Sequence, residues 1–347
     1  MRHFYSYRLL TLLILLAPGI IFSQLSGTYT IGAGGDYTTF SDAADDLNTD
    51  GVTGTVTFDV ISGSYNEQFA IGGISGVSAS NTVTFQAQSG DAADVTISYT
   101  ASGSSDNYIV QLDNTDHIMF KNLSFNTTGS SYARVFDLRN NVDHLTIDQC
   151  ELSGSPTTSS STNYALIYGD DLNGTDFLIT DNTFIDGSSA VYLRGVSSAS
   201  RASNSVIENN DISGDLYYGI YLSYFNNHEI TQNLLEVRNY GFYLQDTDGR
   251  VRVENNRLQT RLSYGIYIVS SEGNADRLRI ANNFLSNTYT GTNYGLYTNN
   301  NSNLDIYHNS VHLTRSSSGY ALYQTGSGND INIVNNIFAN FGGGYAT

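Results

Sequence analysis

Residues 207–212 read Ile207-Glu-Asn-Asn210-Asp-Ile212. The same pattern recurs along the chain: an apolar residue, two further residues, an asparagine, a variable residue and a second apolar residue. Six more stretches keep the asparagine and both apolar residues: Ile179-Thr-Asp-Asn182-Thr-Phe184, Ile230-Thr-Gln-Asn233-Leu-Leu235, Val253-Glu-Asn-Asn256-Arg-Leu258, Ile280-Ala-Asn-Asn283-Phe-Leu285, Ile306-Tyr-His-Asn309-Ser-Val311 and Ile333-Val-Asn-Asn336-Ile-Phe338. An earlier stretch, Ile147-Asp-Gln-Cys150-Glu-Leu152, has cysteine at the asparagine position. Internal repetition at a nearly constant period indicates a solenoid.

The repeat length identifies the kind of solenoid. Successive asparagines are separated by 28, 23, 23, 27, 26 and 27 residues, which is too short for a propeller blade, and the leucine pattern of a leucine-rich repeat is missing. Apolar and polar residues alternate within the copies, as they do in half-buried strands. We therefore expect an all-β protein, a parallel β-helix in which each repeat forms one coil of three short strands.

The repeated asparagine is interpreted as structural. Where the chain bends between two strands, an inward polar side chain must find partners or cost about 1–3 kcal/mol. Coils stacked about 4.8 Å apart would let each amide donate to the carbonyl of the next coil, and asparagine also tolerates the left-handed conformation that such a bend requires. Cys150, the only cysteine, falls in the same column. This predicts a packed free thiol and excludes an internal disulfide.

A second motif lies between the asparagine repeats, for example Tyr240-Gly-Phe-Tyr-Leu244. The other copies are Tyr218-Gly-Ile-Tyr-Leu222, Tyr264-Gly-Ile-Tyr-Ile268, Tyr294-Gly-Leu-Tyr-Thr298 and Tyr320-Ala-Leu-Tyr-Gln324. If the residues on both sides of the second tyrosine point inward, that tyrosine points outward. Six successive coils then present an outward row about 24 Å long, formed by Tyr192, Tyr221, Tyr243, Tyr267, Tyr297 and Tyr323. Two interpretations stay open, which are ring stacking that stabilises the sheet and a binding platform for a repeating polymer.

The ends of the solenoid are expected to differ. Thr39-Phe-Ser-Asp42 resembles a capping box that opens a short helix through Leu47, and such a helix would cover the open end of the core. We assign residues 24–80 to this N-terminal cap and the first coils. Residues 81–347 are assigned to the β-helix repeats, whose C-terminal end we expect to be uncapped or continued by further chain. Less regular strands are expected at Val56–Phe58, Val83–Phe85, Val95–Ile97 and Ile118–Phe120.

Residues 1–23 have the features of a signal peptide. Arg2 and Arg8 precede an apolar run from Leu9 to Phe22, which is too short for a comfortable transmembrane span. The formal charge of the chain is −18, or about −20 without the two leader arginines, and such an acidic surface argues against nucleic acid as a partner. No later stretch is long and apolar enough to cross a membrane. We therefore expect an exported protein that is secreted or held at the cell surface.

Three stretches near the N-terminus carry a family resemblance: Gly34-Gly-Asp-Tyr-Thr-Thr-Phe40, Val56-Thr-Phe-Asp-Val60 and Gly63-Ser-Tyr65-Asn-Glu67. They resemble the start of the pectin methylesterases and of other secreted bacterial β-helix proteins. The later coils are similar to the right-handed β-helix repeat of the pectate-lyase-like superfamily, so the resemblance covers almost the whole chain after the leader. It implies a right-handed parallel β-helix and an association with carbohydrate.

The active-site motifs of these families are only partly matched. Pectin methylesterases carry a Gln-Asp-Thr aspartate as general acid and a second aspartate about one coil later as nucleophile. Gln245-Asp246-Thr247 matches the first motif, whereas the stretch one coil on, Tyr264–Ile268, contains no carboxylate. Two carboxylates are needed for that chemistry. Polygalacturonase-like hydrolases keep acids just before the glycine of the second motif, where this chain has Tyr217-Tyr218, Asn239-Tyr240 and Ser263-Tyr264.

Polysaccharide lyases of this fold use an arginine or lysine as base, which makes Arg252 and Arg279 the candidates. Both precede an apolar residue of the repeat, in a column that has Glu229 and Asp305 at its ends, so a lateral ladder of salt bridges is the alternative interpretation. The histidines lack the spacing of metal ligands. We expect no metal and no other cofactor, and leave calcium among the turn acids open.

The preferred hypothesis is a secreted or cell-surface protein that binds polysaccharide through the outward tyrosines and is not an enzyme. The first alternative is a carbohydrate-active enzyme, either a lyase that uses Arg252 or Arg279 or a pectinesterase-like enzyme that uses Asp246. A structural stalk or adhesin is the second alternative. The sequence does not indicate which glycan is bound or how many copies assemble.

Overall fold

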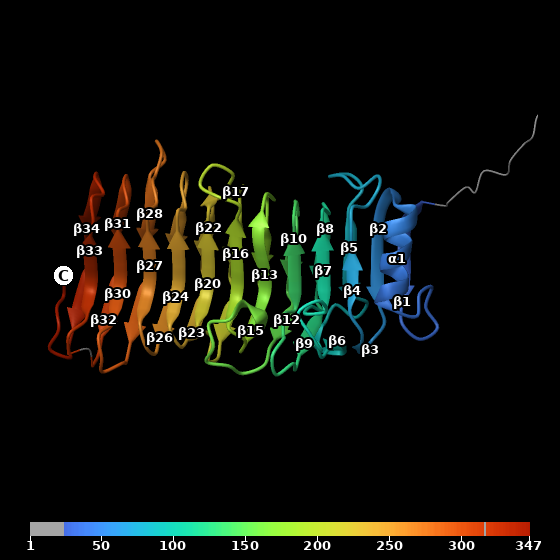
Figure 1. Cartoon of the computed structure of the whole chain (residues 1–347), viewed down its shortest axis with the longest axis horizontal. Coiled ribbons are helices and arrows are strands. Elements are labelled where there is room, and N and C mark those ends of the chain that lie inside the picture. The colour runs from blue at the N-terminus through green and yellow to red at the C-terminus, as the bar shows by residue number, and fades with distance from the viewer. Residues whose placement is uncertain (1–23, 316) are drawn as a thin grey trace, which may run out of the picture.

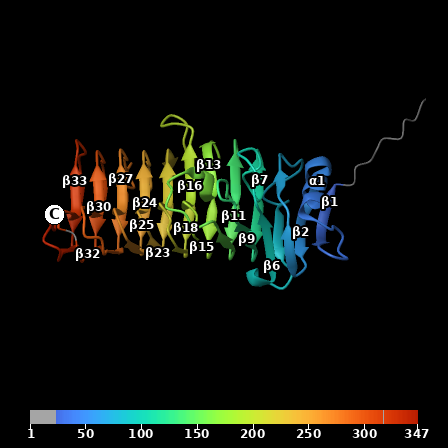
Figure 2. The same ribbon diagram turned by 60° about the horizontal axis from the view of Figure 1, so that its bottom comes forward.

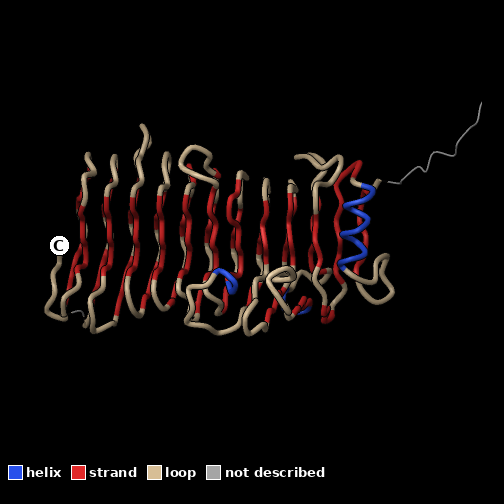
Figure 3. The backbone as a smooth tube through the Cα atoms, in the orientation of Figure 1, coloured by secondary structure: helices blue, strands red, loops and turns tan. Residues whose placement is uncertain are grey.

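The structure is a computed structural model that describes residues 24–315 and 317–347. Over these residues the chain winds into a right-handed parallel β-solenoid of about 12 turns, with a short helix at the N-terminal end (Figure 1). The coils keep the same order along one axis when the molecule is turned by 60° (Figure 2). Loops project mainly at the edges of the stacked strands (Figure 3). The predicted fold is therefore confirmed.

Three long parallel sheets run along the solenoid. The twelve-stranded sheet contains β1 (Leu25–Ile31), β2 (Val52–Val60), β5 (Val83–Ala87), β8 (Ile118–Lys121), β11 (Thr146–Asp148), β14 (Leu178–Thr180), β18 (Val206–Glu208), β22 (Glu229–Thr231), β25 (Arg252–Glu254), β28 (Leu278–Ala281), β31 (Leu304–Tyr307) and β34 (Ile331–Val334). The eleven-stranded sheet contains β3 (Gly63–Asn66), β6 (Val95–Tyr99), β9 (Ser124–Thr127), β12 (Glu151–Ser153), β15 (Thr183–Ile185), β19 (Asp211–Ser213), β23 (Leu234–Val237), β26 (Arg257–Thr260), β29 (Phe284–Asn287), β32 (Ser310–Leu313) and β35 (Ile337–Asn340).

The ten-stranded sheet contains β4 (Phe69–Ile71), β7 (Val110–Asp113), β10 (Phe136–Arg139), β13 (Ala165–Leu172), β16 (Ser189–Gly195), β20 (Tyr218–Ser223), β24 (Tyr240–Gln245), β27 (Tyr264–Val269), β30 (Tyr294–Asn299) and β33 (Tyr320–Thr325). The remaining elements are the pair β17 (Ala202–Ser203) and β21 (Phe225–Asn226), the helix α1 (Phe40–Asp50) and the 3₁₀ turns η1 (Ala92–Asp94) and η2 (Thr162–Tyr164). In a typical coil the chain passes from the ten-stranded to the twelve-stranded and then to the eleven-stranded sheet.

The helix α1 closes the N-terminal end of the core, as predicted. Thr39 is its N-cap, and the side-chain oxygen of Thr39 accepts a hydrogen bond from the Asp42 N–H at 3.0 Å. Phe40 is buried and stacks on Phe69 of β4 at 5.1 Å between ring centroids. The helix continues three residues beyond the predicted end, to Asp50, where Gly51 (φ 71°) stops it.

Columns of aliphatic side chains fill the interior of the solenoid. The column that contains Ile207 continues in register through neighbouring strands and is fully buried at Ile147, Ile179, Ile207, Ile230, Val253, Ile280 and Ile306. Burying such a side chain contributes about 1.5–3 kcal/mol. Ile333 ends the column in the last described coil, and it is 39% exposed. Each coil therefore depends on both neighbours for the burial of its apolar residues.

The asparagine column is a continuous hydrogen-bond ladder. Asn256 illustrates it: its Nδ2 donates to the Ile230 carbonyl at 2.8 Å and to Asn283 Oδ1 at 3.0 Å. Its Oδ1 accepts from the backbone N–H and from Nδ2 of Asn233 at 2.9 and 3.0 Å. The same bonds join Asn182, Asn210, Asn233, Asn256, Asn283, Asn309 and Asn336. The predicted bonds between coils are confirmed, and amide-to-amide bonds add to them.

The left-handed residue of this turn precedes the ladder residue instead of coinciding with it, so this part of the prediction was wrong. The residues with positive φ are Gln149, Asp181, Asn209, Gln232, Asn255, Asn282, His308 and Asn335. The preceding residue takes up the bend, which leaves the ladder side chain directed into the core. Cys150 occupies the column as predicted: its N–H donates to Asn182 Oδ1 at 2.9 Å, and burial raises the pKa of its thiol to about 12.

The early strands follow the prediction with one difference. Val56, Val83 and Ile118 are in register within the twelve-stranded sheet. Val95, whose sequence looks the same, begins β6 in the eleven-stranded sheet. The alternation of residue types is common to both sheets, so it cannot assign a strand to one of them.

Candidate functional site

The outward tyrosines lie on the ten-stranded sheet, in register from coil to coil. Strand pairing aligns them in one column, which we call the outer row: Tyr168, Tyr192, Tyr221, Tyr243, Tyr267, Tyr297 and Tyr323. All seven are half-buried, while their neighbours along each strand, such as Ile220 and Leu222, are fully buried. The row is one coil longer than predicted, because Tyr168 of β13 also belongs to it.

A second row of tyrosines lies beside the outer row. These residues also pair from coil to coil, and we call them the edge row: Tyr218, Tyr240, Tyr264, Tyr294, Tyr320 and Tyr345. Strict alternation would place Tyr218 and Tyr221 on opposite faces of the strand, so the sequence pattern missed this row. The outer and edge rows together form the tyrosine face.

The glycine of the motif brings both tyrosines to the same face. Gly219 and Ile220 are both buried, which interrupts the alternation and leaves the side chains of Tyr218 and Tyr221 outside. A Cβ atom on Gly219 would lie 2.4 Å from Leu235 Cδ2 and 2.6 Å from the Gly241 carbonyl oxygen. Glycine is therefore required by the close approach of the next coil. The glycine was the signal in the sequence that could have revealed the edge row.

The rings of the tyrosine face cover one another. In the outer row, the Tyr221 and Tyr243 rings are 4.8 Å apart and inclined by 12°. In the edge row, the Tyr240 and Tyr264 rings are 4.8 Å apart and inclined by 10°. Rings of different rows meet edge to face, as do Tyr240 and Tyr267 at 5.8 Å and 86°. The ring faces are thus largely occupied by neighbouring tyrosines, and the ring edges and hydroxyl groups remain for contact with a ligand.

Burial also raises the pKa of several hydroxyl groups of this face. It raises the pKa of Tyr218 and of Tyr264 to about 12, and neighbouring tyrosines add to the effect. Burial likewise raises the pKa of Tyr243 and Tyr267 above the ordinary value. Tyrosine is ordinarily protonated at neutral pH, so the face is an uncharged array of hydrogen-bond donors and acceptors.

A charged cluster covers one end of the outer row. The Arg134 guanidinium carbon lies 3.5 Å from the centroid of the Tyr168 ring. Asp137, which precedes Tyr168 in the column, is 2% exposed and is paired with Arg134 at 3.0 Å and Arg139 at 2.7 Å. These ion pairs satisfy the buried carboxylate, and the guanidinium closes the stack of rings at this end.

The proposed esterase acid, Asp246, lies in the turn after β24, next to the tyrosine face. Its Oδ2 accepts a hydrogen bond from Gln245 Nε2 at 3.2 Å, and its own backbone has a positive φ of 50°. The next coil places Ser270 at the corresponding left-handed position. The structure therefore brings no second carboxylate into the position that the two-carboxylate mechanism needs, one coil after Asp246.

The proposed lyase bases, Arg252 and Arg279, lie on the twelve-stranded sheet and not on the sheet of the tyrosine face. They are paired with each other in the strand register. Arg279 forms an ion pair with Glu254, and hydrogen bonding to this carboxylate raises its pKa. Arg252 donates to the carbonyl groups of Arg277 and Asp276 at 2.6 and 2.8 Å, and burial lowers its pKa. Both guanidinium groups thus already have partners within the protein.

Three open hollows adjoin one another along the turns that lead from the ten-stranded to the twelve-stranded sheet. The first, of about 460 Å³, is lined by Arg201, Asn227, Asp248 and Glu272 among others. The second, of about 470 Å³, shares Asn227 with it, and the third, of about 280 Å³, reaches His144. Among the charged residues of their lining, the acids Asp176, Glu229, Asp248, Glu272 and Asp276 outnumber the arginines Arg201 and Arg250. No motif in the sequence marks this groove, because its residues come from turns of unequal length.

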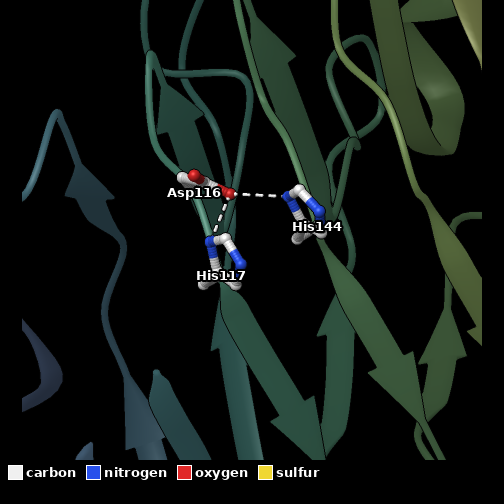
Figure 4. A group of neighbouring side chains, drawn as sticks. All are labelled: Asp116, His117 and His144. Atoms are coloured by element: carbon white, nitrogen blue, oxygen red, sulfur yellow. Dashed lines mark hydrogen bonds and ion pairs between the residues drawn. The ribbon is translucent and has the colours of Figure 1, made fainter. Parts of the chain in front are cut away.

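Two histidines that lie 27 residues apart in the sequence meet at the end of this groove, where His144 lines the third hollow. His117 precedes β8, His144 precedes β11, and their rings stack at 4.1 Å between centroids with 11° between planes. Asp116 Oδ1 lies between them, 2.7 Å from His117 Nδ1 and 3.0 Å from His144 Nδ1 (Figure 4). The histidines lack the spacing of metal ligands along the chain, whereas the stacking of coils brings these side chains together in space.

The remaining predictions concern export. The predicted signal peptide, residues 1–23, lies outside the residues that the structure describes. Among residues 24–315 and 317–347, no helix has the length and apolar character needed to span a membrane.

Solved structures with a similar backbone path include carbohydrate-active proteins. The pectin methylesterase from Aspergillus niger is 16% identical over 88% of this chain and 87% of that chain, with a TM-score of 0.35. The GH136 lacto-N-biosidase from Eubacterium ramulus is 10% identical over 88% of this chain and 68% of that chain, with a TM-score of 0.48. At such identities these similarities assign no residue role to this chain. No curated protein sequence matches the chain.

The coil repeat described above is also matched by the sequence model of a protein family. The model, described as the right handed beta helix region, matches residues 108–256 and 165–338. These two overlapping matches contain all seven ladder asparagines and most of the tyrosine face. The chain therefore belongs to the right-handed β-helix family.

Proposed function

We propose that this protein is exported and binds a polysaccharide along its tyrosine face. The observation that carries the proposal is the double row of tyrosines, which are aligned from coil to coil on one sheet. Tyrosine combines an apolar ring with a polar tip and loses little side-chain entropy on binding, which makes it effective in recognition. An array that repeats with each coil suits a ligand that repeats with each monomer.

The ring geometry defines the kind of contact. Because the rings stack on one another, sugar rings would meet tyrosine edges and hydroxyl groups, and the polymer would run along the solenoid axis. Outer-row rings follow one another at 4.2–5.8 Å. The hydroxyl groups stay neutral, and the chain carries a net charge of −18. Both features favour an uncharged polysaccharide over a polyanion.

Export is supported by the sequence of residues 1–23, with its two arginines followed by an apolar run. A secreted or cell-surface location would place the tyrosine face where extracellular glycans occur. The chain's single free cysteine is buried and therefore makes no demand on the redox state of the compartment.

Binding without cleavage is favoured over the enzymatic alternatives by the surroundings of the candidate residues. Asp246 has Ser270 at the corresponding position of the next coil, and Arg279 is neutralised by Glu254. A lyase base must be able to take up a proton, and the raised pKa of Arg279 opposes this role. The lyase candidates also lie on a different sheet from the tyrosine face.

The decisive experiment measures the affinity of the protein for neutral polysaccharides with tyrosine variants. Tyr243→Phe/Tyr267→Phe removes two hydroxyl groups and keeps the ring stack, and is expected to weaken binding roughly tenfold, since each hydrogen bond contributes about 0.5–1.5 kcal/mol. Tyr243→Ala/Tyr267→Ala should lose more. Tyr307→Phe, on the twelve-stranded sheet, is the matched control and should bind like the wild type.

Three outcomes would contradict the proposal. Undiminished binding in both double variants would remove the tyrosine face from recognition. Absence of binding to any glycan would leave a stalk or adhesin. Release of unsaturated sugars or of methanol from pectin, abolished by Asp246→Asn, Arg252→Ala or Arg279→Ala, would establish an enzyme.

A further inference from the structure

We propose that Asp116, His117 and His144 form a binding site for a divalent transition-metal ion such as Zn²⁺. Each residue offers one ligand atom, and these three atoms lie within 4.8 Å of one another. Two imidazoles and one carboxylate are a ligand set suited to Zn²⁺ and its neighbours, while Ca²⁺ and Mg²⁺ prefer oxygen ligands throughout. The site lies apart from the tyrosine face and does not depend on polysaccharide binding.

The distances between the ligand atoms are close to those of a metal site. Three ligands bound to one Zn²⁺ at about 2.0–2.2 Å lie roughly 3.3 Å from one another in a tetrahedral arrangement. Asp116 Oδ1 is 2.7 Å from His117 Nδ1 and 3.0 Å from His144 Nδ1. An ion would therefore need only a small opening of the cluster, together with a rotation of the stacked rings toward a common point. His144, whose side chain is 45% exposed, has room for this rotation.

One ligand atom lacks a hydrogen bond. His117 Nδ1 is buried and, despite its short distance to Asp116, has no hydrogen-bond partner of acceptable geometry within the described residues. A buried ring nitrogen without a partner is costly. A metal ion between the three groups would give this nitrogen a strong partner and would neutralise the Asp116 carboxylate.

Asp176, from the next coil, supplies the outer carboxylate that metal-bound histidines usually have. Its Oδ2 lies 3.5 Å from His144 Nε2. With Nδ1 on the metal, the proton of His144 resides on Nε2 and can be donated to Asp176, which orients the ring and makes it a better ligand. Thr175 Oγ1 donates to Asp176 Oδ2 at 2.8 Å and holds that carboxylate in place.

The fold holds the two histidines in equivalent positions. Both have left-handed backbones, with φ of 52° at His117 and 47° at His144, and the residues before them, Asp116 and Asp143, are paired between neighbouring coils. In later coils the same turn position is occupied by Asn204 and Asn227, also with positive φ. A bound ion would therefore connect two consecutive coils, and it would leave coordination positions open to water.

The asparagines of later coils provide variants that keep the turn. His117→Asn/His144→Asn removes both imidazoles and retains a residue that accepts the left-handed conformation. Asp176→Asn removes the outer carboxylate only. His312→Asn, on β32, removes a histidine that packs against Phe341 and lies outside the cluster, and serves as the control.

The test is calorimetric titration of the untagged protein with Zn²⁺, combined with absorption spectra of the Co²⁺ form, which report the coordination geometry. Wild type and His312→Asn should bind one ion per chain at this site. The double histidine variant should bind at least 100-fold more weakly and lose the Co²⁺ spectrum, while Asp176→Asn should lose about 10-fold to 100-fold. Unchanged affinity in the double variant, with wild-type circular dichroism, would overturn the proposal, as would failure of the wild type to bind Zn²⁺.

Discussion

Removing one rung of the asparagine ladder should destabilise the solenoid far more in its interior than at its end. In Asn256→Ala, Asn233 loses the acceptor of its backbone N–H and of one amide hydrogen, at 2.9 and 3.0 Å. Both ladder residues are 1% exposed, so water does not readily replace the lost partner. Each buried donor left without a partner costs about 1–3 kcal/mol. The expected loss in the free energy of unfolding is therefore about 3 kcal/mol.

Asn336→Ala is the matched control. It removes the same two bonds, to the backbone N–H and Nδ2 of Asn309 at 2.8 and 3.0 Å. Asn309, which carries both donors, is 1% exposed, but Asn336 is only half-buried in the last described coil, so water can occupy the place of the removed amide and accept from both donors. The expected loss is below about 1 kcal/mol, because a hydrogen bond exchanged for one with water contributes little net stability.

Urea unfolding followed by circular dichroism gives the two free energies. Hydrogen exchange of the Asn233 amide provides a local measurement that does not require two-state unfolding, which solenoids need not obey. This amide should exchange much faster in Asn256→Ala than in the wild type. Equal losses in the two variants, within about 0.5 kcal/mol, would refute the argument that buried amide bonds of the ladder hold the coils together.

Four further predictions concern other columns. Cys150→Asn should extend the ladder by one rung, because the new side-chain amide could donate to the Phe120 carbonyl and to Asn182 Oδ1. The free energy of unfolding in urea should rise by about 1 kcal/mol. A lower urea midpoint than that of the wild type would contradict this. Gly265→Ala should lower the free energy of unfolding by about 1–3 kcal/mol in the same assay, because its Cβ would lie 2.5 Å from the Gly295 carbonyl oxygen. In the control Gly63→Ala, the Cβ has no neighbour closer than 3.6 Å, and the free energy of unfolding should hardly change. Burial lowers the pKa of His228 to about 3, so the contribution of its neutral imidazole to the free energy of unfolding is complete above the unfolded pKa of about 6.5 and is lost as the pH falls toward 3. His228→Leu should therefore resist acid unfolding better than the wild type. An identical acid midpoint would contradict the burial argument. The raised pKa values of Tyr218 and Tyr264 act in the opposite direction: the stability that their protonated hydroxyl groups contribute is complete below about pH 10 and is lost as the pH rises toward 12. In an alkaline titration, tyrosinate absorbance should show a group of tyrosines that ionises late in the folded state and is absent in urea.

The sequence alone was enough to predict the coil, its ladder and its outward tyrosines. These features depend on short-range order: the alternation of inward and outward residues, and an asparagine at a constant place in each repeat. Because every coil repeats the same local conformation, alignment of the repeats already predicts which side chains are stacked. This is why Asn256, Tyr243 and even the unusual Cys150 could be placed in their columns.

The tertiary structure alone decided which residues of different turns meet. The separation of 27 residues between His117 and His144 is that of one coil and places both at the same point of the repeat, but only the turn geometry shows that their rings stack with Asp116 between them. The edge row depends on the close approach of neighbouring coils at Gly219, which interrupts the alternation on which the sequence analysis relied. Likewise, only the order of the sheets separates Arg252 from the tyrosine face. Contacts within a column follow from the repeat, whereas contacts between turns and between sheets follow from the path of the whole chain.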